Sequence, residues 1–217
     1  MREKTVKKRG RKQKALRCLL WMGILLLFNT VFHGLPLFRF QARNTMEIEF
    51  ELEKSHVIWE ETANQGWWNG KTHCLSADSD TAIFYNMHLV PFYGWENGVL
   101  GLLNKNTSEV IDALWDSHYD ADNHRTMWIA GYVASDQVAY VEYTFIWEHE
   151  IVETYLVPQE AYVWDGNDRY YIYDTGTSLY SEDGLYGNEY GRLSNVIVIV
   201  RDEKERIIYQ KSLYPKW

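Results

Sequence analysis

The stretch LSNVIVIV at residues 193–200 decides the fold class of this chain. It is almost wholly apolar and rich in β-branched residues, the pattern of a central strand buried on both sides. The charged run RDEKE at residues 201–205 follows it and predicts a turn. Residues 206–213 (RIIYQKSL) then predict a partner strand. The C-terminal part of the chain is therefore expected to form a β-hairpin inside a mainly β domain.

Further strand candidates precede this hairpin. They are short runs rich in β-branched and aromatic residues, and turns separate them at intervals of about 10 residues. The runs lie at residues 56–60, 81–90, 99–103, 127–133, 138–147, 150–157 and 169–174. This spacing indicates a β-sandwich or a β-barrel. No Gly-Ser-rich or Pro-rich linker divides residues 46–217, so this part is expected to form one domain, with a split near residues 105–125 as the alternative.

Two other segments carry a clear period. Residues 46–53 (MEIEFELE) alternate strictly between apolar and acidic residues, which predicts a half-buried strand with four glutamates facing solvent. Residues 108–115 (SEVIDALW) place four apolar side chains at helical spacing after a serine that can cap a helix. The domain is therefore expected to contain at most this one short helix.

The segment IAGYVASDQVAYVEY at residues 129–143 resembles a module of exported bacterial proteins. There, a Gly-containing strand, a short turn and a V-x-x-V-x-V strand open half of an immunoglobulin-like sandwich. The similarity covers residues 126–213 and is shared with uncharacterised membrane-anchored proteins of Gram-positive bacteria. It implies an immunoglobulin-like β-sandwich outside the cytosol and supplies no catalytic residue. The chain departs from the module in its last turn, where Glu205 replaces the usual glycine.

Residues 18–38 (CLLWMGILLLFNTVFHGLPLF) carry no formal charge. The hydrocarbon core of a bilayer is about 30 Å thick and needs about 20 apolar residues in a helix. Pro36 is expected to kink or end the helix near its outer end. The only candidate signal-peptidase site, Phe40-Gln41-Ala42, has a bulky residue where a small one is needed. The sequence therefore predicts an uncleaved signal-anchor that spans the membrane once.

The charge is divided very unevenly along the chain. Residues 1–17 contain nine Lys or Arg against Glu3, a net charge of +8, and the whole chain carries −8, so the remainder carries −16. A basic segment directly before a span predicts a cytosolic N-terminus and attracts anionic lipid headgroups. The acidic remainder repels nucleic acid. We therefore expect a cell-membrane protein with membrane lipid as a partner and no nucleic acid. Its parts are a basic cytosolic tail at 1–17, a transmembrane helix at 18–38, a linker at 39–45 and an extracytoplasmic β-rich domain at 46–217.

The two cysteines cannot pair within one chain, because the predicted membrane separates Cys18 from Cys74. A plain buried thiol is expected at both positions. Palmitoylation of Cys18 and an intermolecular bridge through Cys74 are the alternatives.

The hexapeptide DTGTSL at residues 174–179 resembles the active-site signature of aspartic proteases. In those enzymes two such aspartates share a proton, because two carboxylates about 3 Å apart cannot both be ionised. Asp-Thr-Gly occurs once in this chain, which excludes a bilobed enzyme. A dimeric enzyme needs a hydrophobic-hydrophobic-Gly turn after the next strand, where this chain has Arg201. Asp174 is therefore predicted to start a turn. A membrane-anchored aspartic protease stays as the alternative function.

Two imidazoles and three carboxylates lie within residues 116–124 (DSHYDADNH). Asp120, Asp122 and His124 alternate like the ligands of a calcium loop. An EF-hand also needs Gly at its sixth position and Glu at its twelfth, and neither possible register supplies them. The segment is therefore predicted to be a polar surface loop that binds no metal. A metal-dependent hydrolase that uses the loop from His118 to His124 is the other form of the alternative function.

Aromatic residues make up 16% of the chain, with ten Trp and sixteen Tyr. Several fall in predicted turns, where they can stack on sugars of a cell wall, although Trp and Tyr also pack well in cores. The candidate binding residues are Trp67, Trp68, Trp95 and Trp164. No G-x-S-x-G, G-x-G-x-x-G or P-loop motif is present. The sequence therefore predicts a non-catalytic binding or interaction domain without a cofactor, whose partner is a protein or another component of the cell envelope.

Overall fold

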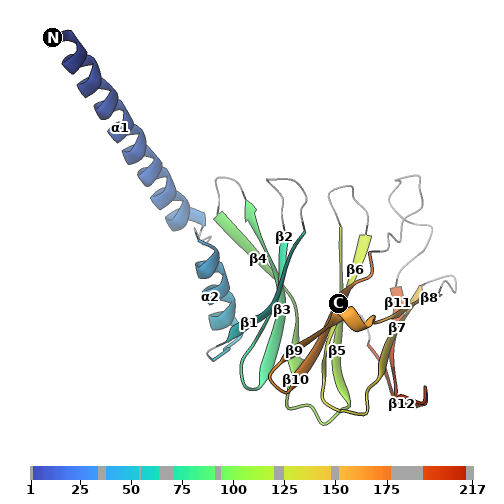
Figure 1. The fold of residues 1–217 in the computed structure, drawn as a ribbon. Coiled ribbons are helices and arrows are strands. Elements are labelled where there is room, and N and C mark those ends of the chain that lie inside the picture. The colour runs from blue at the N-terminus through green and yellow to red at the C-terminus, as the bar shows by residue number, and fades with distance from the viewer. Residues whose placement is uncertain are drawn as a thin grey trace, which may run out of the picture. The chain divides into compact units, whose positions relative to one another are not determined.

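The computed structural model describes residues 2–33, 38–53, 55–63, 71–90, 94–119, 125–147, 152–176 and 193–213. The fold is mainly β, as the sequence predicts (Figure 1). The described strands form three four-stranded antiparallel sheets, with few helices. The chain forms two compact units. Unit 1 comprises Met1–Glu51, Thr62–Thr72 and Met87–Gly98, and unit 2 comprises Leu52–Glu61, His73–Asn86 and Val99–Trp217.

Unit 1 begins with the long helix α1 (Arg2–His33), which joins the basic segment and most of the apolar stretch in one element. Large apolar side chains along it are exposed, namely Leu16, Leu19, Leu20, Trp21, Met22, Ile24, Leu25, Leu27 and Phe28. Within the part of the chain that the structure describes, none of the helices has the length and apolar character that a membrane crossing requires.

A second helix, α2 (Arg39–Glu49), occupies the segment expected to be a linker at residues 39–45. It also shows that the strand predicted for residues 46–53 is wrong. Ala42 and Met46 are four residues apart and are both buried, so burial follows the helical period of 3.6 residues. A further short helix, η2 (Gln159–Ala161), is of the 3-10 type. The expectation of at most one helix in the β-rich part is therefore also wrong.

Sheet A has the strand order β1-β2-β3-β4. The bounds of these strands are His56–Ala63, Lys71–Ala77, Thr81–Val90 and Gly94–Asn104. The strands predicted at residues 56–60, 81–90 and 99–103 are confirmed as all or part of β1, β3 and β4. Strand β2 has no counterpart among the predicted strands.

Sheet B has the strand order β5-β6-β10-β9. The bounds are Ile111–Tyr119 for β5, Arg125–Val133 for β6, Tyr162–Asp165 for β9 and Asp168–Asp174 for β10. The strands predicted at 127–133 and 169–174 are confirmed. The short helix predicted for residues 108–115 is wrong, because β5 pairs antiparallel with β6 from Ile111 onward.

Sheet C has the strand order β12-β11-β7-β8. The bounds are Tyr140–Trp147 for β7, Val152–Leu156 for β8, Leu193–Arg201 for β11 and Ile207–Ser212 for β12. The predicted C-terminal hairpin is confirmed, since β11 pairs antiparallel with β12 and lies between β12 and β7. In its turn Glu205 has φ 61°, so a glutamate adopts the left-handed conformation usually taken by glycine.

The prediction that β11 is buried on both sides is wrong. Val196, Val198 and Val200 are fully buried, whereas the alternating residues Ile197 and Ile199 are only half-buried. Strand β11 therefore sends one row of side chains into the core and the other row to the outer face of sheet C.

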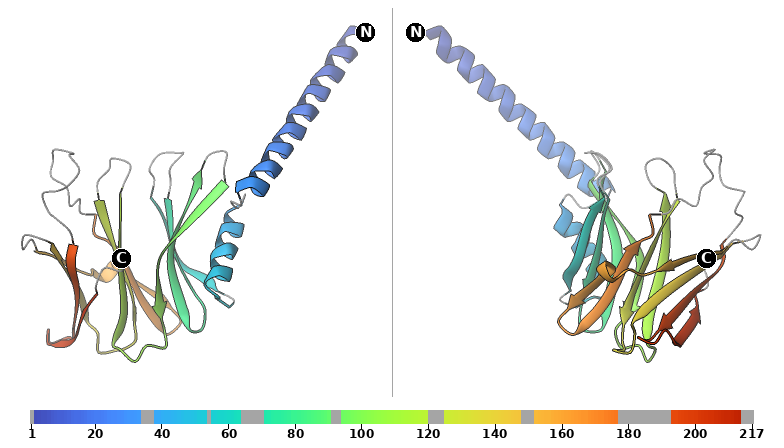
Figure 2. Two further views of the ribbon diagram at one scale, coloured as in Figure 1. Left: turned by 180° about the vertical axis from the view of Figure 1, so that it is seen from behind. Right: turned by 45° about the vertical axis from the view of Figure 1, so that its right-hand side comes forward.

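Sheet B is instead the layer that is buried on both sides within unit 2 (Figure 2). One face packs against sheet C and the other against those parts of the sheet A strands that belong to unit 2. Successive residues of β6 enter the two cores in turn: Met127 and Ile129 face sheet C, and Trp128 and Ala130 face sheet A.

A pair of buried tyrosines lies in the core between sheets B and C. The hydroxyl oxygens of Tyr143 and Tyr171 are 2.8 Å apart, and the Tyr143 hydroxyl is 3.2 Å from the carbonyl oxygens of Leu114 and Ala130. Burial raises the pKa of both hydroxyls above the usual range, so both stay protonated. The Tyr171 phenol lies against Gly131, where a Cβ atom would overlap it. The glycine of the segment at 129–143 is thus explained by close packing of an aromatic ring.

Candidate functional site

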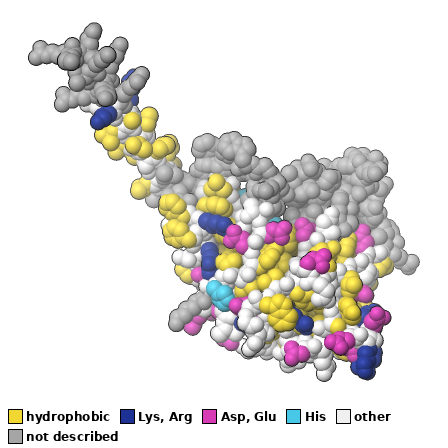
Figure 3. Space-filling view, in the orientation of Figure 1, with side chains coloured by type: hydrophobic (Ala, Val, Ile, Leu, Met, Phe, Trp, Pro, Cys, Tyr) yellow, Lys and Arg dark blue, Asp and Glu magenta, His cyan; other side chains and the backbone are white. Residues whose placement is uncertain are grey.

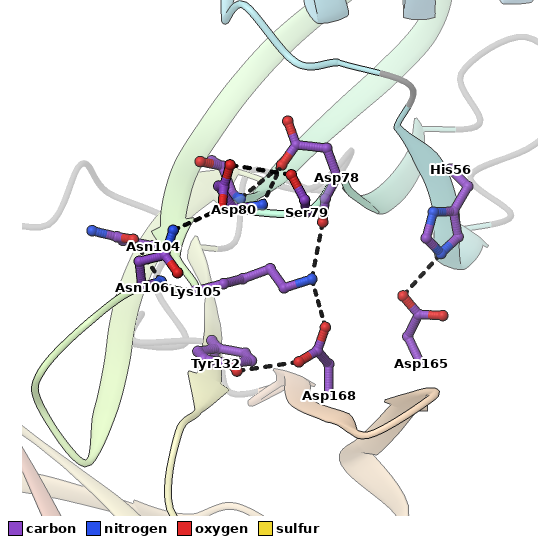
Figure 4. Close-up of polar contacts among 11 residues, drawn as sticks. His56, Asp78, Ser79, Asp80, Asn104, Lys105, Asn106, Tyr132, Asp165 and Asp168 are labelled. Carbon is purple, nitrogen blue, oxygen red and sulfur yellow. Dashed lines mark hydrogen bonds and ion pairs between the residues drawn. The ribbon is translucent and has the colours of Figure 1, made fainter.

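A network of polar side chains joins three turns of unit 2, and we call it the Lys105 cluster (Figure 4). The turns are residues 78–80 between β2 and β3, residues 105–110 between β4 and β5, and residues 166–167 between β9 and β10. Nζ of Lys105 lies 2.5 Å from Oδ2 of Asp168 and donates a hydrogen bond to the Asp78 carbonyl oxygen at 2.9 Å. The Lys105 side chain is only 10% exposed, so this ion pair is well shielded from water.

Asp78 organises the first turn. Its Oδ1 accepts hydrogen bonds from the backbone N–H groups of Asp80 at 2.9 Å and Thr81 at 2.8 Å. Its Oδ2 accepts one from the backbone N–H of Glu53 at 3.1 Å. Burial opposes ionisation of this carboxyl, but the three N–H donors and Lys105 outweigh it and hold the pKa of Asp78 below its usual value. Asp78 therefore acts as a charged acceptor for backbone donors.

The first two turns are also tied together by amide groups. Oδ1 of Asp80 accepts a hydrogen bond from the side-chain amide of Asn106 at 2.8 Å, and the backbone N–H of Lys105 donates to the Asp80 carbonyl oxygen at 2.8 Å. The backbone N–H of Asn106 donates to the side-chain oxygen of Asn104 at 2.8 Å. Each turn thus fixes the backbone of the other.

Asp168 completes the cluster. Its Oδ1 accepts a hydrogen bond from the Tyr132 hydroxyl at 3.2 Å, while its Oδ2 pairs with Lys105. Burial, followed by the nearby Asp168 charge, raises the pKa of Tyr132. Both carboxylate oxygens of Asp168 are therefore engaged and the Lys105 ammonium is paired. Because these groups are occupied by one another, the arrangement fits a structural role, holding strands of sheets A and B together, better than a role in proton transfer.

A histidine that pairs with an aspartate lies near the Lys105 cluster. Nε2 of His56 is 2.9 Å from Oδ2 of Asp165, and the His56 side chain is 57% exposed (Figure 4). Among the described residues, no group of three or more His, Cys, Asp or Glu side chains is placed to hold a metal ion. The surface loop predicted for residues 116–124 is wrong for residues 116–119, because these belong to β5 and His118 pairs with Thr126 of β6. Residues 120–124 lie outside the described residues, and the side chain of His118 is not described.

Among the described residues predicted to bind a ligand, Trp164 is the one that is exposed to solvent. It lies on the edge strand β9 and is 62% exposed. The guanidinium carbon of Arg169 lies 5.6 Å from the ring centroids of both Trp164 and Tyr162. The same guanidinium donates hydrogen bonds to the carbonyl oxygens of Ser135 and Val138 at 3.2 and 2.9 Å. The exposed indole therefore rests on a cation that the backbone holds in place.

Of the other predicted aromatic residues, the structure describes Trp95. Trp95 is half-buried in β4 and belongs to unit 1, whereas Trp164 belongs to unit 2. Trp67 and Trp68 lie outside the described residues. A cluster of aromatic rings is buried between sheet B and the unit 2 part of sheet A. In it the His73 ring centroid lies 4.4 Å from that of Trp128, and the Phe84 ring lies beside Trp128. Its members were not among the predicted site residues.

Asp174 is the last residue of β10 and is exposed. Its Oδ1 accepts a hydrogen bond from the backbone N–H of Gly176 at 3.0 Å, and Gly176 has φ 60°. The predicted turn at this aspartate is thereby confirmed as a side chain–backbone turn.

The cysteines differ from each other. Cys74 is fully buried in β2, as predicted, and Cys18 is exposed on α1, so the prediction of a buried thiol there is wrong. Because Cys74 follows His73 in a strand, the two side chains point to opposite faces of sheet A.

Comparison with protein-family models, with curated proteins and with solved structures gave no match. The residues of the Lys105 cluster were not predicted as a site. Sequence signals for its turns exist, because Asp-Ser-Asp at 78–80 and Asp-Gly-Asn-Asp at 165–168 are strong turn formers. Nothing in their spacing shows that these turns meet.

Proposed function

We propose that this chain is a single-pass membrane-anchored, non-catalytic interaction protein whose β-rich part lies outside the cytosol. The observation that carries the anchor is the exposure of the apolar side chains of α1. Leu19, Leu25 and Leu27 are 60%, 65% and 70% exposed, and Figure 3 shows apolar side chains gathered along the described part of this helix. Contiguous apolar surface of this kind is stabilised by contact with lipid or protein rather than water.

The charge distribution supports the orientation. The segment before the apolar stretch carries +8 and the rest of the chain −16. Positive residues next to a span are retained on the cytosolic side. We place the β-rich part at the outer surface of the cell membrane, with a protein or another component of the cell envelope as its partner.

The non-catalytic role is supported by the way charged groups are used in unit 2. Lys105, Asp168 and Asp78 hold turns together, and their donors and acceptors are occupied by one another and by backbone groups. The proposed ligand contact is Trp164, whose indole offers a large flat surface at little cost in side-chain entropy. The immunoglobulin-like character of residues 126–213 belongs to the proposal as well, and the face-to-face packing of sheets B and C supports it.

Protease treatment of intact cells that express the full chain tests the proposed topology. We expect the β-rich part to be digested and an N-terminal epitope to survive. An intact chain of 25.7 kDa that is digested only after lysis would contradict the orientation. Extraction of the protein by carbonate alone, without detergent, would contradict the anchor.

A further inference from the structure

Strand β8 is an edge strand of sheet C, paired through β7 on one side. Its side chains alternate, with Val152, Thr154 and Leu156 exposed and Glu153 and Tyr155 partly buried. Val152 and Leu156 are 56% and 54% exposed. The strand thus combines an unused edge, among the described strands, with apolar side chains beside it. Natural edge strands usually carry lysine or proline at such positions.

The hydrogen-bond register shows which backbone groups face this edge. The backbone N–H of Val157 donates to the carbonyl oxygen of Val141 at 2.9 Å, so these opposite residues form a hydrogen-bonded pair. Hydrogen-bonded and non-hydrogen-bonded pairs alternate along an antiparallel ladder. Tyr155 and Glu153 therefore bond to β7, and the N–H and C=O groups of Val152, Thr154 and Leu156 point outward.

The outward groups make β8 complementary to itself. In an antiparallel pair of two β8 strands centred on Thr154, Val152 lies opposite Leu156 and Thr154 lies opposite its own copy. Each of these opposite pairs exchanges two backbone hydrogen bonds. On the inner face Glu153 lies opposite Tyr155 of the other copy. Within one chain the Tyr155 hydroxyl already donates to Oε2 of Glu153 at 3.2 Å, so the two groups are suited to each other. No like charges face one another across the axis.

We propose that β8 is a homodimer interface, in which two copies of this chain pair their β8 strands antiparallel and join their C sheets into one eight-stranded sheet. The symmetry of the VETYL sequence about Thr154 favours a second copy over an unrelated extended peptide. The opposite edge of sheet C, β12, lacks this symmetry and carries Lys211, whose Nζ is 2.6 Å from Oε2 of Glu109. The interface is small, so we expect the dimer to dissociate and re-form readily. A covalent cross-link is therefore the best way to detect it.

A cysteine at the two-fold axis tests the geometry. Opposite residues in a hydrogen-bonded pair have Cα atoms about 5.5 Å apart, within the range of a disulfide. In the full chain with Cys18→Ser, mild oxidation of Thr154→Cys in membranes should give a disulfide-linked dimer. The matched control is Gln210→Cys on β12, which is also exposed and should stay monomeric. Equal cross-linking of both variants, or none at position 154, would overturn the proposal.

Charge exchange tests the identity of the partner. Because Thr154 faces its own copy, Thr154→Lys alone and Thr154→Glu alone place like charges together, and each should lower co-purification of two differently tagged full chains several-fold. Co-expression of the two variants should restore it, since Lys then faces Glu. The same exchange at Gln210 should change nothing. If co-purification stays low when the Lys and Glu variants are expressed together, a second copy of this chain does not pair with the β8 edge. This test is independent of the proposed topology, because inverted membrane orientation leaves its outcome unchanged.

Discussion

Strands β6 and β11 are both apolar and both central in their sheets, yet they are buried in different ways. In β6 successive residues enter two cores, so Met127, Trp128, Ile129 and Ala130 are all buried. In β11 burial alternates, and Ile197 and Ile199 lie on the outer face. The difference comes from the neighbouring layers, because sheet B has a sheet on each side and sheet C has sheet B on one side. An apolar run thus shows that a strand is central in its sheet, without showing how many of its faces are covered.

The largest loss of stability is expected when a charged side chain is placed in the core between sheets B and C. Val198→Asp places a carboxylate where no polar partner is described, at a cost of about 4 kcal/mol or more. Ile197→Asp, one residue away on the outer face, should cost about 1 kcal/mol. Thermal unfolding of the full chains in detergent, followed by circular dichroism, compares them. Equal loss of stability would show that sheet C is covered on both faces.

A single added methyl group should also be costly in sheet B. Gly131→Ala places a Cβ atom against the Tyr171 ring, which is itself fixed by its hydrogen bond to Tyr143, and should destabilise the fold by about 3 kcal/mol. Gly23→Ala is the control, since nothing lies within 4 Å of a Cβ at that position of α1. Urea unfolding measures both changes. Unchanged stability of Gly131→Ala would mean that the two tyrosines can move apart.

Removal of one hydroxyl tests the tyrosine pair itself. Tyr143→Phe leaves the buried Tyr171 hydroxyl without its partner at 2.8 Å and should cost about 2 kcal/mol. Tyr140→Phe changes the same type of residue on the other face of β7 and should cost well under 1 kcal/mol. Similar midpoints for the two variants in chemical denaturation would count against the hydrogen bond.

The Lys105 cluster should make stability depend on acid pH. The pKa of Asp78 is lowered in the folded state, so its ionised form favours folding. This contribution is complete above the pKa of the unfolded chain and is lost as the pH falls through the lower folded value. Asp78→Asn should cost about 1 kcal/mol at neutral pH and reduce the loss of stability on acidification. Melting temperatures of both proteins from about pH 7 down to pH 3 test this. Parallel curves would assign the acid sensitivity to other carboxyls.

The smallest effect is expected at Asp174, at the exposed end of β10. Asp174→Asn should keep the fold and cost at most about 1 kcal/mol, because an amide oxygen can still accept from Gly176. The same variant decides the protease alternative. Peptide cleavage by the full chain that Asp174→Asn abolishes and a statine-type transition-state analogue blocks would establish an aspartic protease and refute the proposed non-catalytic role.

The two wrong predictions of secondary structure have different causes. Residues 110–115 show helical spacing of apolar residues, but Ile111, Ala113 and Trp115 face sheet C while Leu114 faces sheet A. A strand buried on both faces loses its period of two, and its pattern then imitates a helix. The opposite error occurs at residues 46–49. There the alternating glutamates conceal the helical spacing of the buried residues Ala42 and Met46 and the ion pair of Arg43 with Glu47 at 2.8 Å.

Local sequence patterns were sufficient to predict those elements whose structure depends on residues close together in the sequence. The strand at 81–90, the C-terminal hairpin and the turn at Asp174 all follow from neighbouring residues. The Lys105 cluster could not be predicted in this way. Lys105 meets Asp78 and Asp168 through the pairing of distant strands, and nothing near Lys105 in the sequence distinguishes it from a solvated surface lysine.

The order of the strands has a consequence for synthesis of the chain on the ribosome. The chain enters sheet B with β5 and β6, moves to sheet C with β7 and β8, returns to sheet B with β9 and β10, and ends in sheet C with β11 and β12. The hairpin of β7 and β8 therefore emerges before β11, the strand that joins β7 to β12. Until β11 and β12 have left the exit tunnel, the inner face of sheet C is incomplete and the core against sheet B stays open. A nascent chain that still lacks β11 therefore exposes apolar side chains of β7, which in the folded protein lie in the core between sheets B and C.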